Sequence, residues 1–98
     1  MNTIIKFSGQ KNLNLAPRTG VLTIAQRPVV VAQRGVSTGS FLATSGGISS
    51  GHTGPCFYSV APSNFLIPWN GGKYQTNLTF TSGCSWTKSS NVPWLVFI

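Results

Sequence analysis

The strongest constraint on the fold is a strict two-residue alternation at residues 74–80. The residues on one face of an extended chain are Tyr74, Thr76, Leu78 and Phe80, and the three residues between them are all polar. Successive side chains of a β-strand point to opposite sides of the sheet. The pattern therefore predicts a strand with one buried face, the clearest in the chain.

Further strand-like segments are separated by Gly, Pro, Ser and Asn. Residues 20–25 alternate and residues 29–33 are rich in β-branched side chains, with a tight connection at residues 26–28. This arrangement predicts a hairpin. Pro28 has no N–H and is expected in the turn or at a strand start. The remaining predicted strands are residues 3–7, 56–61, 65–68 (an edge-like segment), 84–88 and 93–98.

The composition favours an all-β fold. Of the 98 residues, 41% are hydrophobic, and the polar remainder is mainly Ser, Thr, Asn, Gly and Gln. Such a composition suits short strands and turns rather than helices. A chain of this length forms one domain with a modest core.

Residues 34–55 differ from the rest of the chain because they are rich in Gly, Ser and Thr. They are predicted to be a flexible linker between residues 1–33 and 56–98, partly docked through Phe41 and Leu42. The alternative is a loop with one weak strand at residues 40–44.

The charge balance is one-sided, with seven Lys or Arg residues and no Asp or Glu. Side-chain salt bridges are therefore impossible, and glycosidase chemistry based on two carboxylates is excluded. The basic residues never occur side by side. Their spacing favours scattered solubilising charge, and the alternative is binding of an anionic polymer.

The sequence offers no catalytic or metal-binding set. His52 is the single histidine, and no acidic residue exists to orient it for Ser–His–Asp or Cys–His chemistry. Two cysteines and one histidine make a poor structural zinc site, which normally has four ligands. We expect an exposed loop histidine and a non-enzymatic protein without a metal or cofactor.

Two groups of motifs resemble a known family. Residues 83–98 contain Cys-x-Trp followed by Trp-Leu, and residues 14–33 contain Asn, then Arg-x-Gly-x-Leu-x-Ile, and end in Gln. Together they resemble BACON-like modules, which are immunoglobulin-like β-sandwiches of extracellular bacterial proteins, often found beside carbohydrate-active domains. The resemblance implies an immunoglobulin-like sandwich of about seven or eight short strands.

The two halves of this module are in reverse order. Residues 1–33 match the closing half of the family pattern, and residues 56–98 match the opening half. The first explanation is a circular permutant that folds as one domain. In the second, the leading half completes a neighbouring copy, giving a strand-exchanged oligomer or filament. The third is a fragment of a longer array.

The resemblance also implies a disulfide between Cys56 and Cys84, because the family commonly carries cysteines at these positions. Such a bond would contribute about 3–4 kcal/mol and would indicate an extracellular or cell-surface protein. Two buried free thiols in the cytosol are the alternative. Residues 1–6 show no secretory signal peptide, and no segment has the length and apolarity of a transmembrane span.

Three tryptophans divide into two groups. Trp86 and Trp94 fall at family positions and are expected in the core, whereas Trp69 adjoins an Asn-Gly-Gly turn. Trp69, Asn70 and Tyr74 are therefore the candidate ligand-binding residues, with the aromatic rings as a platform for a sugar. The expected function is a non-enzymatic structural or adhesive module. The alternatives are a glycan-binding module and a basic domain that binds anionic polymers.

Overall fold

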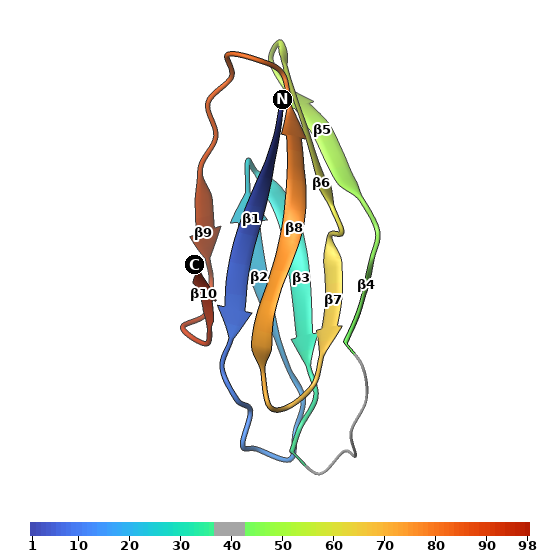
Figure 1. The fold of residues 1–98 in the computed structure, drawn as a ribbon, viewed down its shortest axis with the longest axis vertical. Coiled ribbons are helices and arrows are strands. Elements are labelled where there is room, and N and C mark those ends of the chain that lie inside the picture. Colours follow the sequence, from blue (N-terminus) through green and yellow to red (C-terminus); the bar gives the residue numbers. More distant parts are fainter. Residues whose placement is uncertain (37–42) are drawn as a thin grey trace.

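The computed structural model describes residues 1–36 and 43–98, which contain ten β-strands and no helix (Figure 1). In chain order the strands are β1 (Asn2–Gly9), β2 (Arg18–Ile24), β3 (Arg27–Gln33), β4 (Thr44–Gly46), β5 (Ser49–Thr53), β6 (Cys56–Ala61), β7 (Asn64–Ile67), β8 (Gly72–Phe80), β9 (Lys88–Ser90) and β10 (Leu95–Phe97).

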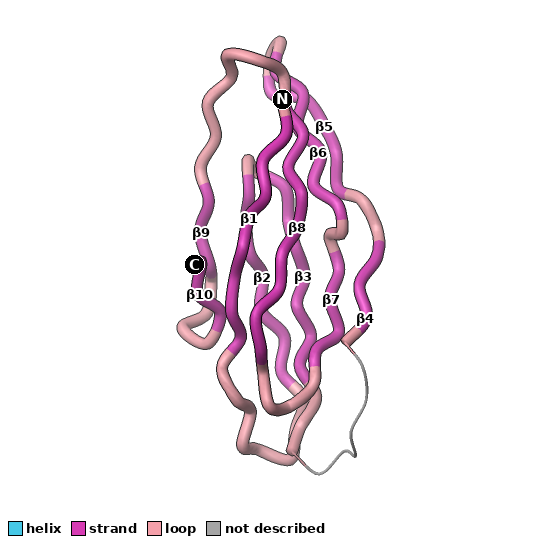
Figure 2. Tube along the Cα trace, in the orientation of Figure 1, coloured by secondary structure: helices cyan, strands magenta, loops and turns pink. Residues whose placement is uncertain are grey.

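The strands form two five-stranded sheets that lie face to face (Figure 2). One sheet has the order β10-β1-β8-β6-β5 and the other has the order β4-β7-β3-β2-β9. The β3–β7 pair is parallel, and the other pairs are antiparallel. The predicted all-β sandwich is confirmed, although the described residues hold more strands than the sequence indicated.

Four short strands form the two sides of the sandwich. On one side, β4 pairs with β7 of one sheet and the next strand, β5, pairs with β6 of the other. On the opposite side, β9 pairs with β2 and the next strand, β10, pairs with β1. Each pair of consecutive short strands therefore crosses from one sheet to the other and covers two edges.

The prediction of a linker at residues 34–55 is wrong for residues 44–53, which form β4 and β5. Their side chains are mostly exposed, so these strands are held by backbone pairing rather than by an apolar face. Gly47 has a φ of 77°, and its left-handed conformation allows the chain to bend between the sheets. Phe41 and Leu42, the predicted docking residues, lie outside the described residues, as does most of the alternative strand at 40–44.

The hairpin of β2 and β3 is confirmed, with a connection shorter than expected. Ala25 and Gln26 form the turn with φ of 52° and 65°, the two left-handed positions of a type I′ turn. Pro28 lies near the start of β3 opposite Thr23, as its missing N–H requires.

Two strand predictions need correction. Residues 84–87 form a loop, and the strand that follows begins at Lys88, because this segment crosses from one sheet to the other. Residues 65–68 do not form an edge, because β7 lies between β3 and β4.

The two halves of the chain share one core. β1, from the leading half, lies between β8 and β10 of the trailing half, and the ring of Phe7 meets the ring of Phe65 edge-on at 5.1 Å. The apolar residues with no exposed surface are Phe7, Leu22, Ile24, Val29, Val31, Val60, Ile67 and Leu78. In this structure, residues 1–33 thus pack into one sandwich with the trailing half of the same chain.

We expect a single species of one chain mass, 10.4 kDa, in size-exclusion chromatography with light scattering. The reason is that β1 already has both of its partners within the chain. Growth into dimers or filaments with rising concentration would instead indicate that the leading half is exchanged between copies.

Candidate functional site

The predicted ligand residues Trp69 and Asn70 lie in the turn between β7 and β8. Asn70 is exposed, and Trp69 is half-buried. The carbonyl of Trp69 accepts hydrogen bonds from the Asn12 N–H at 2.7 Å and from the Gln33 Nε2 at 3.3 Å. The backbone of this turn is therefore tied to the neighbouring loop, and neither Trp69 nor Asn70 lines any of the three hollows described below.

Tyr74, the third predicted residue, packs on the core instead of joining Trp69. Its ring centroid lies 5.9 Å from that of Phe7 and 6.1 Å from that of Phe65. The hydroxyl donates a hydrogen bond to the Gly71 carbonyl at 3.2 Å, and burial raises its pKa. The structure therefore does not bring the three predicted residues together as one platform.

Trp94 is buried, with 8% of its surface exposed, as expected for a core residue. The guanidinium carbon of Arg18 lies 4.3 Å from the centroid of its ring, and desolvation lowers the pKa of Arg18. This cation–π contact joins the two halves of the chain.

Trp86 is only half-buried. Its ring lies 6.4 Å from the ring of Phe80 and also forms part of a pocket wall.

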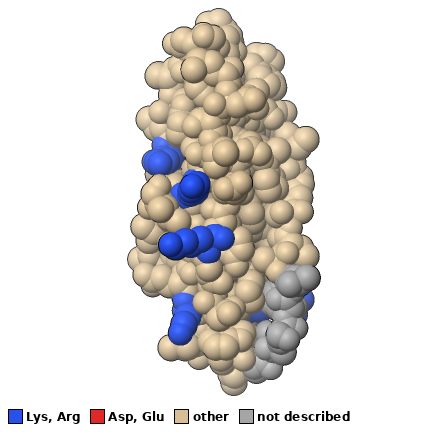
Figure 3. All heavy atoms as spheres, viewed as in Figure 1, with Lys and Arg blue, Asp and Glu red and all other residues tan. Residues whose placement is uncertain are grey.

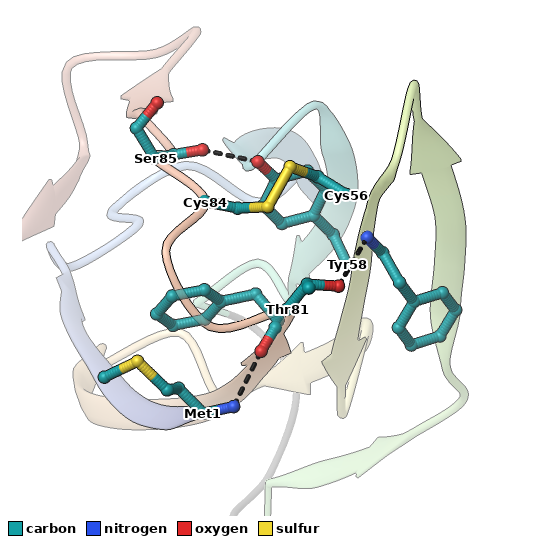
Figure 4. The surroundings of a disulfide bond; sticks show 8 residues. Met1, Cys56, Tyr58, Thr81, Cys84 and Ser85 are labelled. Carbon is teal, nitrogen blue, oxygen red and sulfur yellow. Dashed lines mark hydrogen bonds between the residues drawn. A yellow bond between two sulfur atoms is a disulfide. The ribbon is translucent and has the colours of Figure 1, made fainter.

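The predicted disulfide between Cys56 and Cys84 is present (Figure 4). It joins the start of β6 to the loop after β8, with a Cα–Cα distance of 6.0 Å. The Tyr58 hydroxyl, close to the disulfide in Figure 4, donates a hydrogen bond to the Ser85 carbonyl of the same loop. Residues 84–87 are therefore attached to β6 at two points.

A pocket of about 350 Å³ lies beside this disulfide. Its walls come from the β2–β3 turn, the end of β5, the start of β6 and the loop at residues 84–87. The side chains that line it include Gln26, Thr53, Tyr58, Trp86 and Thr87. None of the lining residues is charged, and the Thr53 hydroxyl donates a hydrogen bond to the Gln26 Oε1 at 3.0 Å. We call this site the disulfide pocket.

The conformation of the β2–β3 turn places Gln26 at the disulfide pocket. Gln26 has a φ of 65°, a left-handed conformation that costs a non-glycine residue about 1–2 kcal/mol. Type I′ turns normally place Asn or Gly at such positions. The turn is held by a hydrogen bond from the Ala25 N–H to the Thr87 carbonyl at 2.8 Å.

The outer face of the sheet that contains β1 carries two further hollows. One, of about 840 Å³, is lined mainly by polar residues of β1, β6 and β8, among them Asn2, Ser59 and Asn77. The other, of about 440 Å³, is lined by Lys6, Lys73, Tyr74, Gln75 and Ile98. We call the second one the basic hollow.

His52 lies on β5 rather than in a loop. It is exposed, and its ring centroid lies 4.9 Å from that of Phe57. Residues 1–36 and 43–98 contain no group of three or more His, Cys, Asp or Glu side chains that could hold a metal ion. No helix with the length and apolarity of a membrane span occurs in that part of the chain.

Comparison of the chain with protein-family models, with curated proteins and with solved structures finds no match. The resemblance to BACON-like modules therefore rests on the sequence motifs.

Sequence reasoning missed Gln26, Thr53 and Thr87, because they are ordinary polar residues on segments far apart in the chain. The expected disulfide was the one sequence feature that pointed to this site, because it brings β6 next to the segment that carries Trp86.

Proposed function

We propose that this domain is a non-enzymatic adhesive module that binds a neutral glycan unit in the disulfide pocket. The observation that carries the proposal is an uncharged pocket lined by Trp86 together with the polar residues Gln26, Thr53 and Thr87. The apolar face of a sugar packs on an aromatic ring, and its hydroxyls exchange hydrogen bonds with amide and hydroxyl groups. The volume is within the usual range of small-molecule sites.

The surroundings of the pocket favour binding without reorganisation. The loop with Trp86 is attached to β6 by the disulfide and by the Tyr58–Ser85 hydrogen bond. The Gln26 turn is attached to the same loop through the Thr87 carbonyl. A preformed site loses less conformational entropy when it binds a ligand.

The disulfide also favours an oxidising compartment, which supports a location at the cell surface or outside the cell. The BACON-like motifs support the same location and an adhesive role. The second candidate is a purely structural module. It is favoured by the short edge strands β4, β5, β9 and β10, because short edge strands limit pairing with other chains.

A printed array of neutral and acidic glycans, followed by calorimetry with the strongest neutral hit, tests the proposal. We expect Gln26→Gly to weaken binding by about tenfold, because the site loses an amide hydrogen bond worth about 1.4 kcal/mol. The same variant should unfold at an equal or higher temperature, because glycine adopts a positive φ without the cost that glutamine bears. Loss of affinity with retained stability separates a binding role from a structural one.

The control variant is Trp69→Ala, which leaves the disulfide pocket intact and is expected to bind normally. Loss of binding in Trp69→Ala with normal binding in Gln26→Gly would place the site at the β7–β8 turn. Absence of any neutral hit would contradict the glycan proposal and leave the structural role.

A further inference from the structure

We infer a second binding site, the basic hollow, which takes the sulfate or carboxylate groups of an acidic polysaccharide. Ile5 and Phe7 are buried in the core, so Lys6 between them faces outward from β1. Lys6 lies opposite Gln75, and Ser8 lies opposite Lys73, in the β1–β8 register. The two lysines are therefore diagonal neighbours on one face, a relation in which Cα atoms lie about 7–8 Å apart.

The charge at this place is not neutralised by any acidic side chain, because the chain contains none. Besides Lys6 and Lys73, the hollow is lined by Tyr74, Gln75 and Ile98, whose side chains carry no charge. Two ammonium groups beside a low-dielectric surface raise the local positive potential and attract anions.

A third lysine extends the positive charge toward the side of the sandwich. Lys88 on β9 holds its Nζ 5.0 Å from the ring centroid of Phe97 on β10. Figure 3 shows basic side chains in a row along the side of this face where β9, β10 and β1 lie. Residues that are widely spaced in the sequence are thus gathered by the fold, which differs from the scattered charge that the sequence indicated.

The chemistry of the hollow favours a polysaccharide over a nucleic acid. Its cations are lysines, which act as point charges and suit sulfate or carboxylate groups without a fixed bidentate geometry. The ring of Tyr74 is packed against Phe7 and Phe65, so it is not free to stack on bases as single-stranded nucleic acids require. A linear polymer with regularly repeated anions matches a row of lysines along the outer face of the sheet.

The test measures binding of a heparin octasaccharide by calorimetry at several salt concentrations. We expect the wild-type affinity to fall steeply with salt, as for other polyanions. Lys6→Gln and Lys73→Gln should each weaken binding about fivefold or more, and the double variant further, with a shallower salt dependence. Both side chains are on the outer face, so the thermal midpoints should stay unchanged.

The matched control is Lys11→Gln, which removes the same charge from an exposed residue that does not line the hollow. It should weaken binding less than twofold. An equal loss in Lys11→Gln would show that binding follows net charge alone and would overturn the site. Absence of heparin binding at low salt would overturn it as well.

Two further probes identify the ligand class. Hyaluronate carries carboxylates without sulfate, and its affinity relative to that of heparin shows which anion the hollow prefers. Weaker binding of hyaluronate or of heparin by Lys73→Gln supports the site. A single-stranded oligothymidylate that binds more tightly than both, with the same lysine dependence, would overturn the assignment to polysaccharide. Gln26→Gly should leave heparin binding unchanged. A result against anion binding in the basic hollow is therefore distinguishable from a result against glycan binding in the disulfide pocket.

Discussion

Replacement of both cysteines, Cys56→Ser with Cys84→Ser, is expected to lower the free energy of unfolding by about 3.5 kcal/mol. The disulfide closes a loop with a sequence separation of 28, and its loss gives the unfolded chain the freedom that the bond had removed. Domains of this size have a total stability of about 5–15 kcal/mol. The loss should lower the thermal midpoint by about 15–25 °C.

Urea denaturation followed by tryptophan fluorescence measures this effect. Wild-type protein in reducing buffer should match the serine variant, because both lack the cross-link, whereas the serine variant itself should not respond to reductant. A loss below about 1 kcal/mol would show that the Tyr58–Ser85 hydrogen bond and the Trp86 packing hold the loop without the disulfide. At temperatures where the variant is still folded, weaker glycan binding is expected, since the loop that carries Trp86 is less restrained.

The second large effect is expected for Gln33→Leu, which should cost about 3 kcal/mol of unfolding free energy. Gln33 ends β3 and has no exposed surface. Its Oε1 accepts a hydrogen bond from the Arg18 Nε at 2.7 Å. Its Nε2 donates to the carbonyls of Gln10, Pro68 and Trp69 at 2.7, 3.2 and 3.3 Å.

Leucine would keep the volume but none of these bonds. The three carbonyls each keep another donor. The largest part of the cost therefore comes from the Arg18 Nε–H, which loses its acceptor while the Nη2 keeps its bonds to the Gln10 and Lys11 carbonyls. Gln33→Glu should be intermediate in stability, because it keeps the bond to Arg18 and loses the donated ones. Gln75→Leu makes the same change on the exposed face of β8, and its free energy of unfolding should stay within about 0.5 kcal/mol of wild type. An equal loss of unfolding free energy in the two leucine variants would refute the role of Gln33.

These contacts give a structural role to two residues of the segment that resembles BACON-like modules. Arg18 lies over Trp94 and bonds to Gln33, which links both residues to the trailing half of the chain. A Cβ on Gly20 would approach the Val92 Cγ2 to 2.6 Å and the Leu95 Cδ1 to 2.7 Å, so a larger residue would force these side chains to shift.

The sequence by itself determined the strands with a buried face. The alternation that ends at Phe80, the β2–β3 hairpin and β6 were predicted because each follows from local side-chain pattern and turn chemistry. The disulfide was predicted from the position of Cys56 and Cys84 in the motifs. The strands and the hairpin depend on residues close together in the chain, and the disulfide depends on where the two cysteines fall in the motifs.

Only the tertiary structure decided which short strands flank the sandwich and which residues line its pockets. β4 and β5 carry no apolar pattern, because backbone pairing with an existing edge is sufficient to hold them. The disulfide pocket combines residues from four segments, and the basic hollow combines Lys6 with Lys73 across two paired strands. Such groupings depend on register and on sheet order, which are set by long-range packing and are not visible in the local pattern.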